Sequence, residues 1–152
     1  MAYSLYRLGQ AARAVALAGT GFSPINRHRL GAVLFDNKGR ILSAKHNSRK
    51  THPELQKRTQ HPFQHAESAT VLGYGLDNCE GHNLLVVRIS ALGTLVCSKP
   101  CSVCTTLMQD AKLRRVYYVN DNNEIEQLGV ATRPTKNSVG LPWSALRFSL
   151  VY

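Results

Sequence analysis

Acidic residues are scarce in this chain, and long hydrophobic segments are absent. Only 9 Asp and Glu stand against 19 Lys and Arg among 152 residues, which gives a formal net charge of +10 at pH 7. No apolar run approaches the roughly 20 residues that a membrane-spanning helix needs, so we do not expect an integral membrane protein. The excess of positive charge favours acidic partners, with nucleic acids and nucleotides first among them.

Internal repeats and low-complexity tracts are absent too, and the remaining composition is that of an ordinary globular protein. The chain is 43% hydrophobic and 18% charged. A chain of this length corresponds to one domain and can bury a core without disulfides. The tail, residues 129–152, has no clear periodicity, and we expect it to dock on the body of the same domain.

The N-terminal segment contains no acidic residue before Asp36 and lacks the long apolar core of a secretory signal. With Arg7 and Arg13 it has the composition of an organellar transit peptide. The alternative is an ordinary first helix with an apolar face formed by Leu5, Leu8, Ala12 and Val15. We favour the helix, because the domain would otherwise lack a covering helix, and we expect a cytoplasmic protein.

The pattern of apolar and turn-forming residues predicts helices and strands in alternation. Helices are expected at 3–18, at 65–74 and within 98–112, the last one preceded by a loop. Strands are expected at 30–35, 40–44, 83–90, 115–119 and 125–128, the first two joined as a hairpin. Residues 45–63 are expected to form a long, functional loop with one helical turn at 54–58. This order predicts a sheet with covering helices and some parallel strand pairs.

Four cysteines are present, and Cys97, Cys101 and Cys104 crowd into eight residues, with Cys79 apart. An even count would suit two disulfides, but a chain of this length does not need them, and crowded cysteines more often bind metal. The C-x-x-C pair of Cys101 and Cys104 alone would also suit a redox site or half of a zinc ribbon. A redox pair is expected earlier in the chain, and a ribbon needs a second C-x-x-C, which the other two cysteines do not form.

His65, Cys101 and Cys104 together provide the three protein ligands of a catalytic zinc site, with the fourth position open for water. They lie at the starts of predicted helices, whose positive ends lower the pKa of thiols. Glu67 follows His65 by two residues, so its carboxylate can reach that water and pass a proton to a leaving group such as ammonia. Cys97 stays open as a competing fourth ligand, which would favour a non-catalytic, zinc-stabilised nucleic-acid-binding module.

The pair of motifs His65-Ala66-Glu67 and Pro100-Cys101-Ser102-Val103-Cys104 resembles the zinc-dependent cytidine and deoxycytidylate deaminase superfamily. The resemblance covers about residues 3–128, and the segment 47–53 is similar to small deaminase-like proteins of phages. It implies a deaminase domain at 1–128, built as a three-layer α/β/α sandwich with a mixed central sheet of about five strands. It also implies a hydrolase that uses Zn2+ to convert a cytosine to uracil with release of ammonia.

The resemblance further implies a role for individual residues. His65, Cys101 and Cys104 would bind the zinc ion, and Glu67 would be the proton shuttle. Substrate contacts would come from Asn47 at the sugar or base edge, the backbone of Ala66 at the base, Ser98 and Lys99 at the amino group and pocket wall, and Asn120 and Asp121 in a substrate-selecting turn.

A basic segment, residues 37–66, holds seven Lys and Arg and one acid, Glu54. Arg49 and Lys50 in this segment are candidate phosphate contacts, and the alternative is an ordinary solvated face. The charge favours a phosphate-bearing substrate, which leaves two readings open. One is nucleotide metabolism, on a free nucleoside or nucleotide. The other is nucleic acid editing, on a cytosine or adenine in single-stranded DNA or RNA such as tRNA. Formation of a homo-oligomer is also open.

Overall fold

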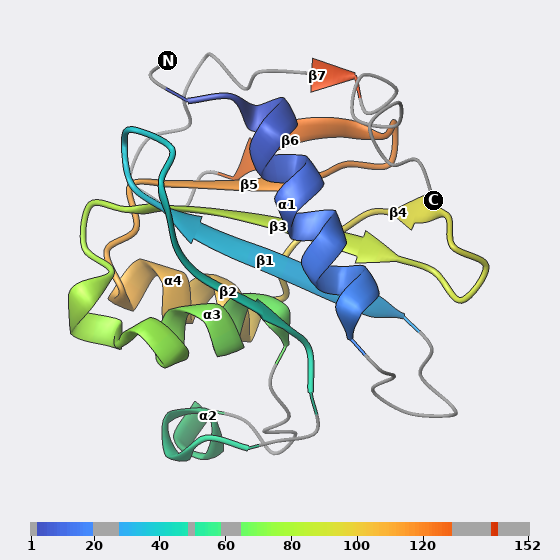
Figure 1. Ribbon diagram of the computed structural model, residues 1–152. Coiled ribbons are helices and arrows are strands. Elements are labelled where there is room, and N and C mark those ends of the chain that lie inside the picture. Colours follow the sequence, from blue (N-terminus) through green and yellow to red (C-terminus); the bar gives the residue numbers. More distant parts are fainter. Residues whose placement is uncertain (1–2, 20–27, 49–50, 59–64, 129–140, 143–152) are drawn as a thin grey trace.

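A mixed seven-stranded sheet lies at the centre of the molecule (Figure 1). The computed structural model describes residues 3–19, 28–48, 51–58, 65–128 and 141–142. The strand order is β2-β1-β3-β5-β6-β7, and β4 pairs with β3 outside this path. The strands are β1 (Arg29–Phe35), β2 (Ile41–His46), β3 (Asn83–Ile89), β4 (Leu95–Val96), β5 (Arg115–Val119), β6 (Glu124–Leu128) and β7 (Leu141–Pro142).

The pairing of these strands confirms the predicted mixed sheet. β3 and β5 run parallel, and the other pairs, β1–β2, β1–β3, β3–β4, β5–β6 and β6–β7, are antiparallel. The five longer strands are the five that the sequence predicts. The short strands β4 and β7 were not anticipated, because two residues are too few to carry an alternation of apolar and polar side chains.

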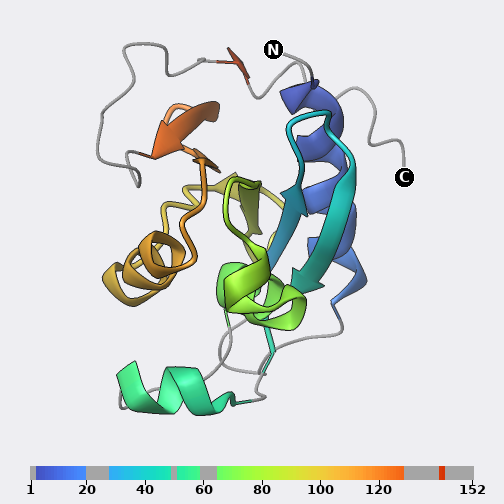
Figure 2. The ribbon, with the colours of Figure 1, turned by 90° about the vertical axis from the view of Figure 1, so that its left-hand side faces the viewer.

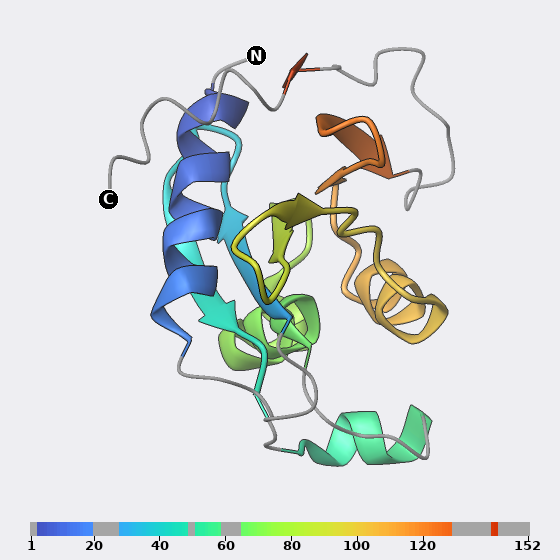
Figure 3. The same ribbon diagram turned by 90° about the vertical axis from the view of Figure 1, so that its right-hand side faces the viewer.

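Helices cover both faces of the sheet, which confirms the three-layer arrangement. α1 (Leu5–Ala18) lies on one face, and α3 (Ala66–Tyr74) and α4 (Ser102–Asp110) lie on the other (Figures 1 and 3). α2 (Pro53–Arg58) lies apart from the sheet, beyond α3 (Figure 2), and the short 3-10 helix η1 (Leu76–Asn78) follows α3. The helix α1 thus confirms the helix that the sequence predicts at 3–18.

The side chains of the central strand β3 contribute to the hydrophobic cores on both faces of the sheet. Its side chains point alternately to opposite faces. Leu84 and Val86 belong to the core beneath α3 and α4, and Leu85 and Val87 belong to the core beneath α1. All four side chains are fully buried. Because both faces are covered, the strand reads as a continuous apolar run instead of an alternating one.

The domain boundary and the absence of a membrane-spanning helix can be compared with the described residues only in part. The division of the chain at residue 128 stays a prediction, since 129–140 and 143–152 lie outside the described part. Within it, Leu141–Pro142 pair with Glu124 and Ile125 of β6. None of the described helices has the length and hydropathy that crossing a membrane requires.

Candidate metal and catalytic site

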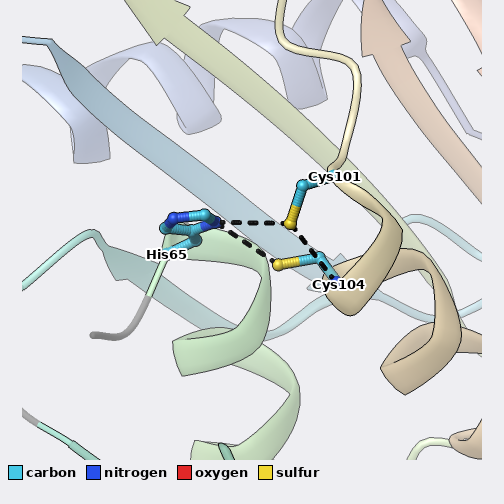
Figure 4. Close-up of side chains that lie close together, drawn as sticks. All are labelled: His65, Cys101 and Cys104. Carbon is cyan, nitrogen blue, oxygen red and sulfur yellow. Dashed lines mark hydrogen bonds between the residues drawn. The ribbon is translucent and has the colours of Figure 1, made fainter. Parts of the chain in front are cut away.

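Three side chains from two separate helix starts converge on one point (Figure 4). The Nδ1 atom of His65 lies 3.8 Å from Cys101 Sγ and 3.5 Å from Cys104 Sγ. The ligand atoms of all three residues lie within 4.8 Å of one another. His65 and Cys101 are 36 residues apart in the sequence, so the packing of α3 and α4 on the same face of the sheet brings them together.

The local backbone explains why these residues face each other. His65 and Cys101 have extended backbones, and the helices α3 and α4 begin at the residues that follow them. Cys101 caps α4, because its Sγ accepts a hydrogen bond from the backbone N–H of Cys104 at 3.5 Å. Hydrogen bonds from Cys104 and from His65 lower the pKa of the Cys101 thiol to about 3. This cysteine is therefore held as the thiolate that binds metal.

The distances between the three residues fit a zinc ion. Tetrahedral zinc with Zn–N near 2.1 Å and Zn–S near 2.3 Å separates a nitrogen ligand from a sulfur ligand by about 3.6 Å. The observed separations of 3.5 and 3.8 Å bracket this value. Among the described residues, no fourth His, Cys, Asp or Glu joins the group, and Cys97 is not part of it. A site with three protein ligands and one open position is typical of catalytic zinc.

Glu67 lies beside this group and is almost completely buried, with 2% of its surface exposed. Its Oε1 atom is 3.8 Å from His65 Nδ1, and its Oε2 atom has no hydrogen-bond partner among the described residues. Burial raises the pKa of this carboxyl group. A buried carboxylate oxygen without a partner is costly, and such atoms are found where a ligand or a proton is received.

The side chains of Asn47, Ser98 and Asn120, which are expected to contact substrate, form hydrogen bonds to other groups of the protein. Asn47 accepts a hydrogen bond from the backbone N–H of Leu30 at 3.0 Å and donates one to a backbone oxygen of His28 at 3.3 Å. The hydroxyl of Ser98 donates to Val86 O and accepts from the N–H of Val119, both at 2.8 Å. Ser98 therefore ties β3 to β5 directly before the cysteine motif.

Asn120 organises the turn between β5 and β6. Its Oδ1 accepts from the N–H groups of Asn122 and Glu124, and its Nδ2 donates to Glu126. Asp121, at the tip of the same turn, is exposed. The side chain of Asn120 thus has a structural task in the turn in addition to the substrate contact expected of it.

The remaining expected contacts differ in how far the structure describes them. Ala66 is fully buried as the first residue of α3, and Lys99 is exposed before the cysteine motif. Arg49 and Lys50 lie outside the described residues. The structure therefore brings together the three expected metal ligands and Glu67, and it leaves the roles of the outer residues as predictions.

Sequence reasoning missed Arg88, the charged residue of strand β3. It is paired in register with Leu30 of β1, whose backbone N–H donates to Asn47, the residue that directly follows β2. Asn47, Leu30 and Arg88 therefore lie in one row across the sheet. Arg88 lies on the sheet face of Val86, which is also the face of α3 and α4. The signal in the sequence is an arginine inside a strand whose other residues are uncharged.

The charge of the Arg88 guanidinium affects the pKa of nearby histidines, and its Nε–H can donate a hydrogen bond to a ligand. Its charge adds to burial in lowering the pKa of His28, and it also acts on His65, whose pKa a hydrogen bond with Cys101 raises. Its Nε atom is buried and without a hydrogen-bond partner among the described residues. No carboxylate of the described part forms an ion pair with it.

Comparison with known families gives the site its context. Residues 8–120 match the family described as the cytidine and deoxycytidylate deaminase zinc-binding region. The chain belongs to this family. It is accordingly a zinc-dependent hydrolytic deaminase, and the resemblance drawn from the two motifs is confirmed. The zinc cofactor agrees with the family and with the grouping of His65, Cys101 and Cys104.

Solved structures provide a second comparison for this deaminase. The dCMP deaminase of cyanophage S-TIM5 is 19% identical, with a TM-score of 0.52 over 75% of this chain and 80% of that one. The cytidine deaminase of Mycobacterium leprae is also 19% identical, with a TM-score of 0.47 over 80% of this chain and 90% of that one. The first comparison supports the deaminase fold. A search of curated proteins finds no match.

Proposed function

We propose that this deaminase converts cytosine to uracil in a phosphate-bearing substrate, a cytosine nucleotide. The observation that carries the reaction is the buried carboxylate of Glu67 beside a three-ligand metal site. Its Oε2 has no hydrogen-bond partner among the residues that the structure describes. A structural zinc site is closed by four ligands and needs no such carboxylate, so this arrangement supports catalysis over a purely stabilising metal.

The chemistry assigned to the site is hydrolytic. A zinc ion held by His65, Cys101 and Cys104 would lower the pKa of water enough to make a hydroxide nucleophile available for C4 of the base near neutral pH. Glu67 takes the two protons of the water in turn and delivers one to N3 of the ring and the other to the departing amino group. In balance, the oxygen of water forms a bond to C4, the C4–N bond breaks, and ammonia leaves.

The substrate contacts in this proposal follow the sequence-based roles. Asn47 meets the sugar or base edge from a position fixed by its hydrogen bonds to the backbone of Leu30 in β1 and of His28 just before it. The backbone of Ala66, at the N-terminus of α3, meets the base. The segment of Ser98 and Lys99 forms the wall near the amino group. The Asn120–Asp121 turn selects the rest of the substrate.

Arg88 supports a nucleotide over a nucleoside. It lies in one row with Asn47, and its buried Nε has no hydrogen-bond partner within the described part of the chain. A guanidinium without a carboxylate is suited to bind the oxygens of a phosphate. We therefore assign the substrate phosphate to Arg88, with Arg49 and Lys50 as candidates for further contacts.

A base in single-stranded DNA or RNA, cytosine or adenine, is the second candidate substrate. The net charge of +10 supports it, since a basic surface attracts a polyanion. We also propose that the protein works in the cytoplasm, where its four free cysteines would stay reduced. Self-association remains an expectation that a mass measurement in solution would test.

Replacing Glu67 by Gln tests the reaction. We expect Glu67→Gln to retain zinc and fold but to lose deamination by about a hundredfold or more, the usual contribution of general acid–base catalysis. Mass spectrometry would follow the gain of about one mass unit when an amino group is replaced by oxygen. The panel holds cytidine, deoxycytidine, their monophosphates, the adenosine counterparts, and single-stranded DNA and RNA oligomers.

The matched control is Glu80→Gln, which neutralises an exposed glutamate of the described surface and should leave the rate unchanged. Undiminished activity in the Glu67 variant would refute the proposed mechanism. Conversion of nucleosides as fast as of their monophosphates would refute the assigned phosphate contact. Conversion of oligomers alone would replace the nucleotide by the second candidate substrate.

A further inference from the structure

One arginine connects the short helix α2 to α4, the helix that begins at the cysteine ligands. Arg58 Nη2 lies 2.6 Å from Asp110 Oδ2, at the end of α4, and 2.9 Å from Glu54 Oε1 within α2. The Nε atom of Arg58 donates to the same Glu54 oxygen at 3.1 Å. Figure 2 shows α2 on the side of α4 that faces away from the sheet. Arg58 therefore bridges two helices that are far apart in the sequence.

The charges of this bridge are used inside the protein. The chain has only 9 acidic residues, and two of them pair with Arg58. The side chain of Arg58 is 19% exposed, so its ion pairs are screened less than pairs on an open surface. The last turn of α4 contains no basic residue. Arg58 supplies the positive charge that stabilises the C-terminal end of a helix.

A buried leucine holds α2 in the same place. Leu55 is 2% exposed and belongs to the core beneath α3 and α4. It precedes Arg58 by three residues, so both side chains lie on the same side of α2, whereas Gln56 and Lys57 are exposed. A helix of six residues is too short to be stable by itself. These two contacts therefore account for the order of α2.

The position of α2 in the chain relates it to the substrate. α2 lies in the middle of the connection between Asn47, the expected sugar or base contact, and His65, the metal ligand. It also lies within the basic segment, residues 37–66, whose charge favours a phosphate-bearing substrate. An attachment near the middle of a long connection leaves two shorter ones with fewer conformations. A segment that is ordered beforehand loses less entropy when a substrate binds.

We propose that Arg58 is a positioning residue for substrate binding, because its bond to Asp110 orders the basic segment before the substrate phosphate arrives. Arg58 itself touches no substrate, since Glu54 and Asp110 occupy its guanidinium. The bond lies at the C-terminal end of α4, about 13 Å along the helix from Cys101, so it acts on binding and not on the chemical step. The proposal rests on the proposed function, whose substrate phosphate it concerns.

The experiment is a double-mutant cycle on the zinc-loaded chain with Arg58→Gln, Asp110→Asn and the two changes combined. Steady-state kinetics on deoxycytidine monophosphate and on deoxycytidine separate KM from kcat. Hydrogen exchange of residues 51–58, followed by mass spectrometry, reports the order of α2 without any turnover. Arg7→Gln and Asp77→Asn are the matched controls, because each removes one charge of the same sign from an exposed residue on another element.

We expect each single variant to raise KM for the monophosphate about fivefold, the upper end for an ion pair that is not fully buried. The double variant should show the same rise, because both changes break one bond. Hydrogen exchange of residues 51–58 should become faster in all three. KM for deoxycytidine, kcat and zinc content should stay at the parent values, and the control variants should match the parent. Arg58→Lys keeps the charge and should recover part of the loss.

Unchanged KM for the monophosphate in both single variants would overturn the proposal, and so would losses that add up in the double variant. An equal rise of KM for deoxycytidine, or a parallel loss of kcat and zinc, would overturn it in favour of a structural role. Each of these results leaves the proposed function intact, since the parent still deaminates the monophosphate. A parent chain that converts no cytosine nucleotide would overturn the proposed function, and hydrogen exchange would still show whether Arg58 and Asp110 hold α2.

Discussion

At the scale of single residues, the phosphate contact proposed for Arg88 is what would favour a nucleotide over a nucleoside substrate. A charge-assisted hydrogen bond contributes about 1.5–3 kcal/mol, or about 10- to 100-fold in affinity. We therefore expect Arg88→Gln to raise KM for deoxycytidine monophosphate by at least about tenfold and to leave kcat near its original value. Steady-state kinetics on the monophosphate and on deoxycytidine would measure this, because the nucleoside should be unaffected.

Two further variants make that test specific for the phosphate. Arg88→Lys keeps the charge but loses the two-pronged geometry of the guanidinium, so it should recover part of the affinity. Arg114→Gln removes an exposed arginine and should leave both substrates unchanged. Equal losses with nucleoside and nucleotide in Arg88→Gln would contradict the assignment and indicate a structural role.

Sequence reasoning reached the inner residues of the site more easily than the outer ones. Two short motifs at helix starts contain His65, Glu67, Cys101 and Cys104. They could be recognised from the sequence alone, because each motif is local and does not depend on how the strands pair. Arg88 could not, because its relation to the site depends on the pairing of β1 with β3. The internal hydrogen bonds of Asn47, Ser98 and Asn120 depend in the same way on strand pairing and turn geometry.

At the scale of elements, the contact between α1 and β1 depends on Gly31. A Cβ at this position would collide with the backbone oxygen of Ala12 and would lie 2.5 Å from the backbone nitrogen of Ala16. Backbone atoms of a helix cannot move aside alone, so the whole helix would shift. We expect Gly31→Ala to lower the free energy of unfolding by about 3 kcal/mol, the upper part of the usual range for overpacking. Urea unfolding would measure it.

Gly93→Ala is the matched control for this change. Gly93 has a positive φ of 81°, but nothing lies within 4 Å of an added Cβ. Its replacement should therefore cost only the backbone strain, roughly 1 kcal/mol. Losses of similar size in the two variants would show that α1 tolerates displacement and that the close packing at Gly31 contributes little.

The elements that could be predicted are those long enough to repeat a pattern. The three helices on the sheet and the five longer strands have 5 to 14 residues each and were located from apolar spacing. The beginning of α4 was less well located, because Cys101 caps it in place of the usual Ser, Thr, Asp or Asn. The helix starts at Ser102, inside the expected 98–112. β2 continues to His46, since Gly31 pairs with that residue.

At the scale of the whole molecule, the metal site joins the N-terminal ends of two helices that belong to the same core. α3 and α4 both pack on the same face of the sheet, and their N-termini bring His65 to Cys101 and Cys104. Two positive helix ends and a buried carboxylate thus share one small region. The hydrophobic core orients the helices, and a bound ion would add the link between their ends.

Removal of zinc should therefore destabilise the entire domain. A ligand present at a thousandfold its Kd stabilises the folded state by about 4 kcal/mol. For a domain of this size that corresponds to about 10 °C in Tm, and we expect a strong chelator to lower Tm by about this amount. Differential scanning calorimetry with chelator, and again after zinc is returned, would measure the fall and its recovery.

Cysteine variants distinguish a zinc ion at this site from zinc bound elsewhere. Cys101→Ser removes one ligand, so its Tm should start low and respond little to chelator. Cys97→Ser changes a half-buried cysteine that is four residues away in sequence but not part of the ligand group, so it should respond to chelator as the natural chain does. An equal response in both variants would mean that the stabilising metal is not held by His65, Cys101 and Cys104. It would also separate the stability of the domain from the chemistry proposed for Glu67, because the shuttle needs the ion at this position and nowhere else.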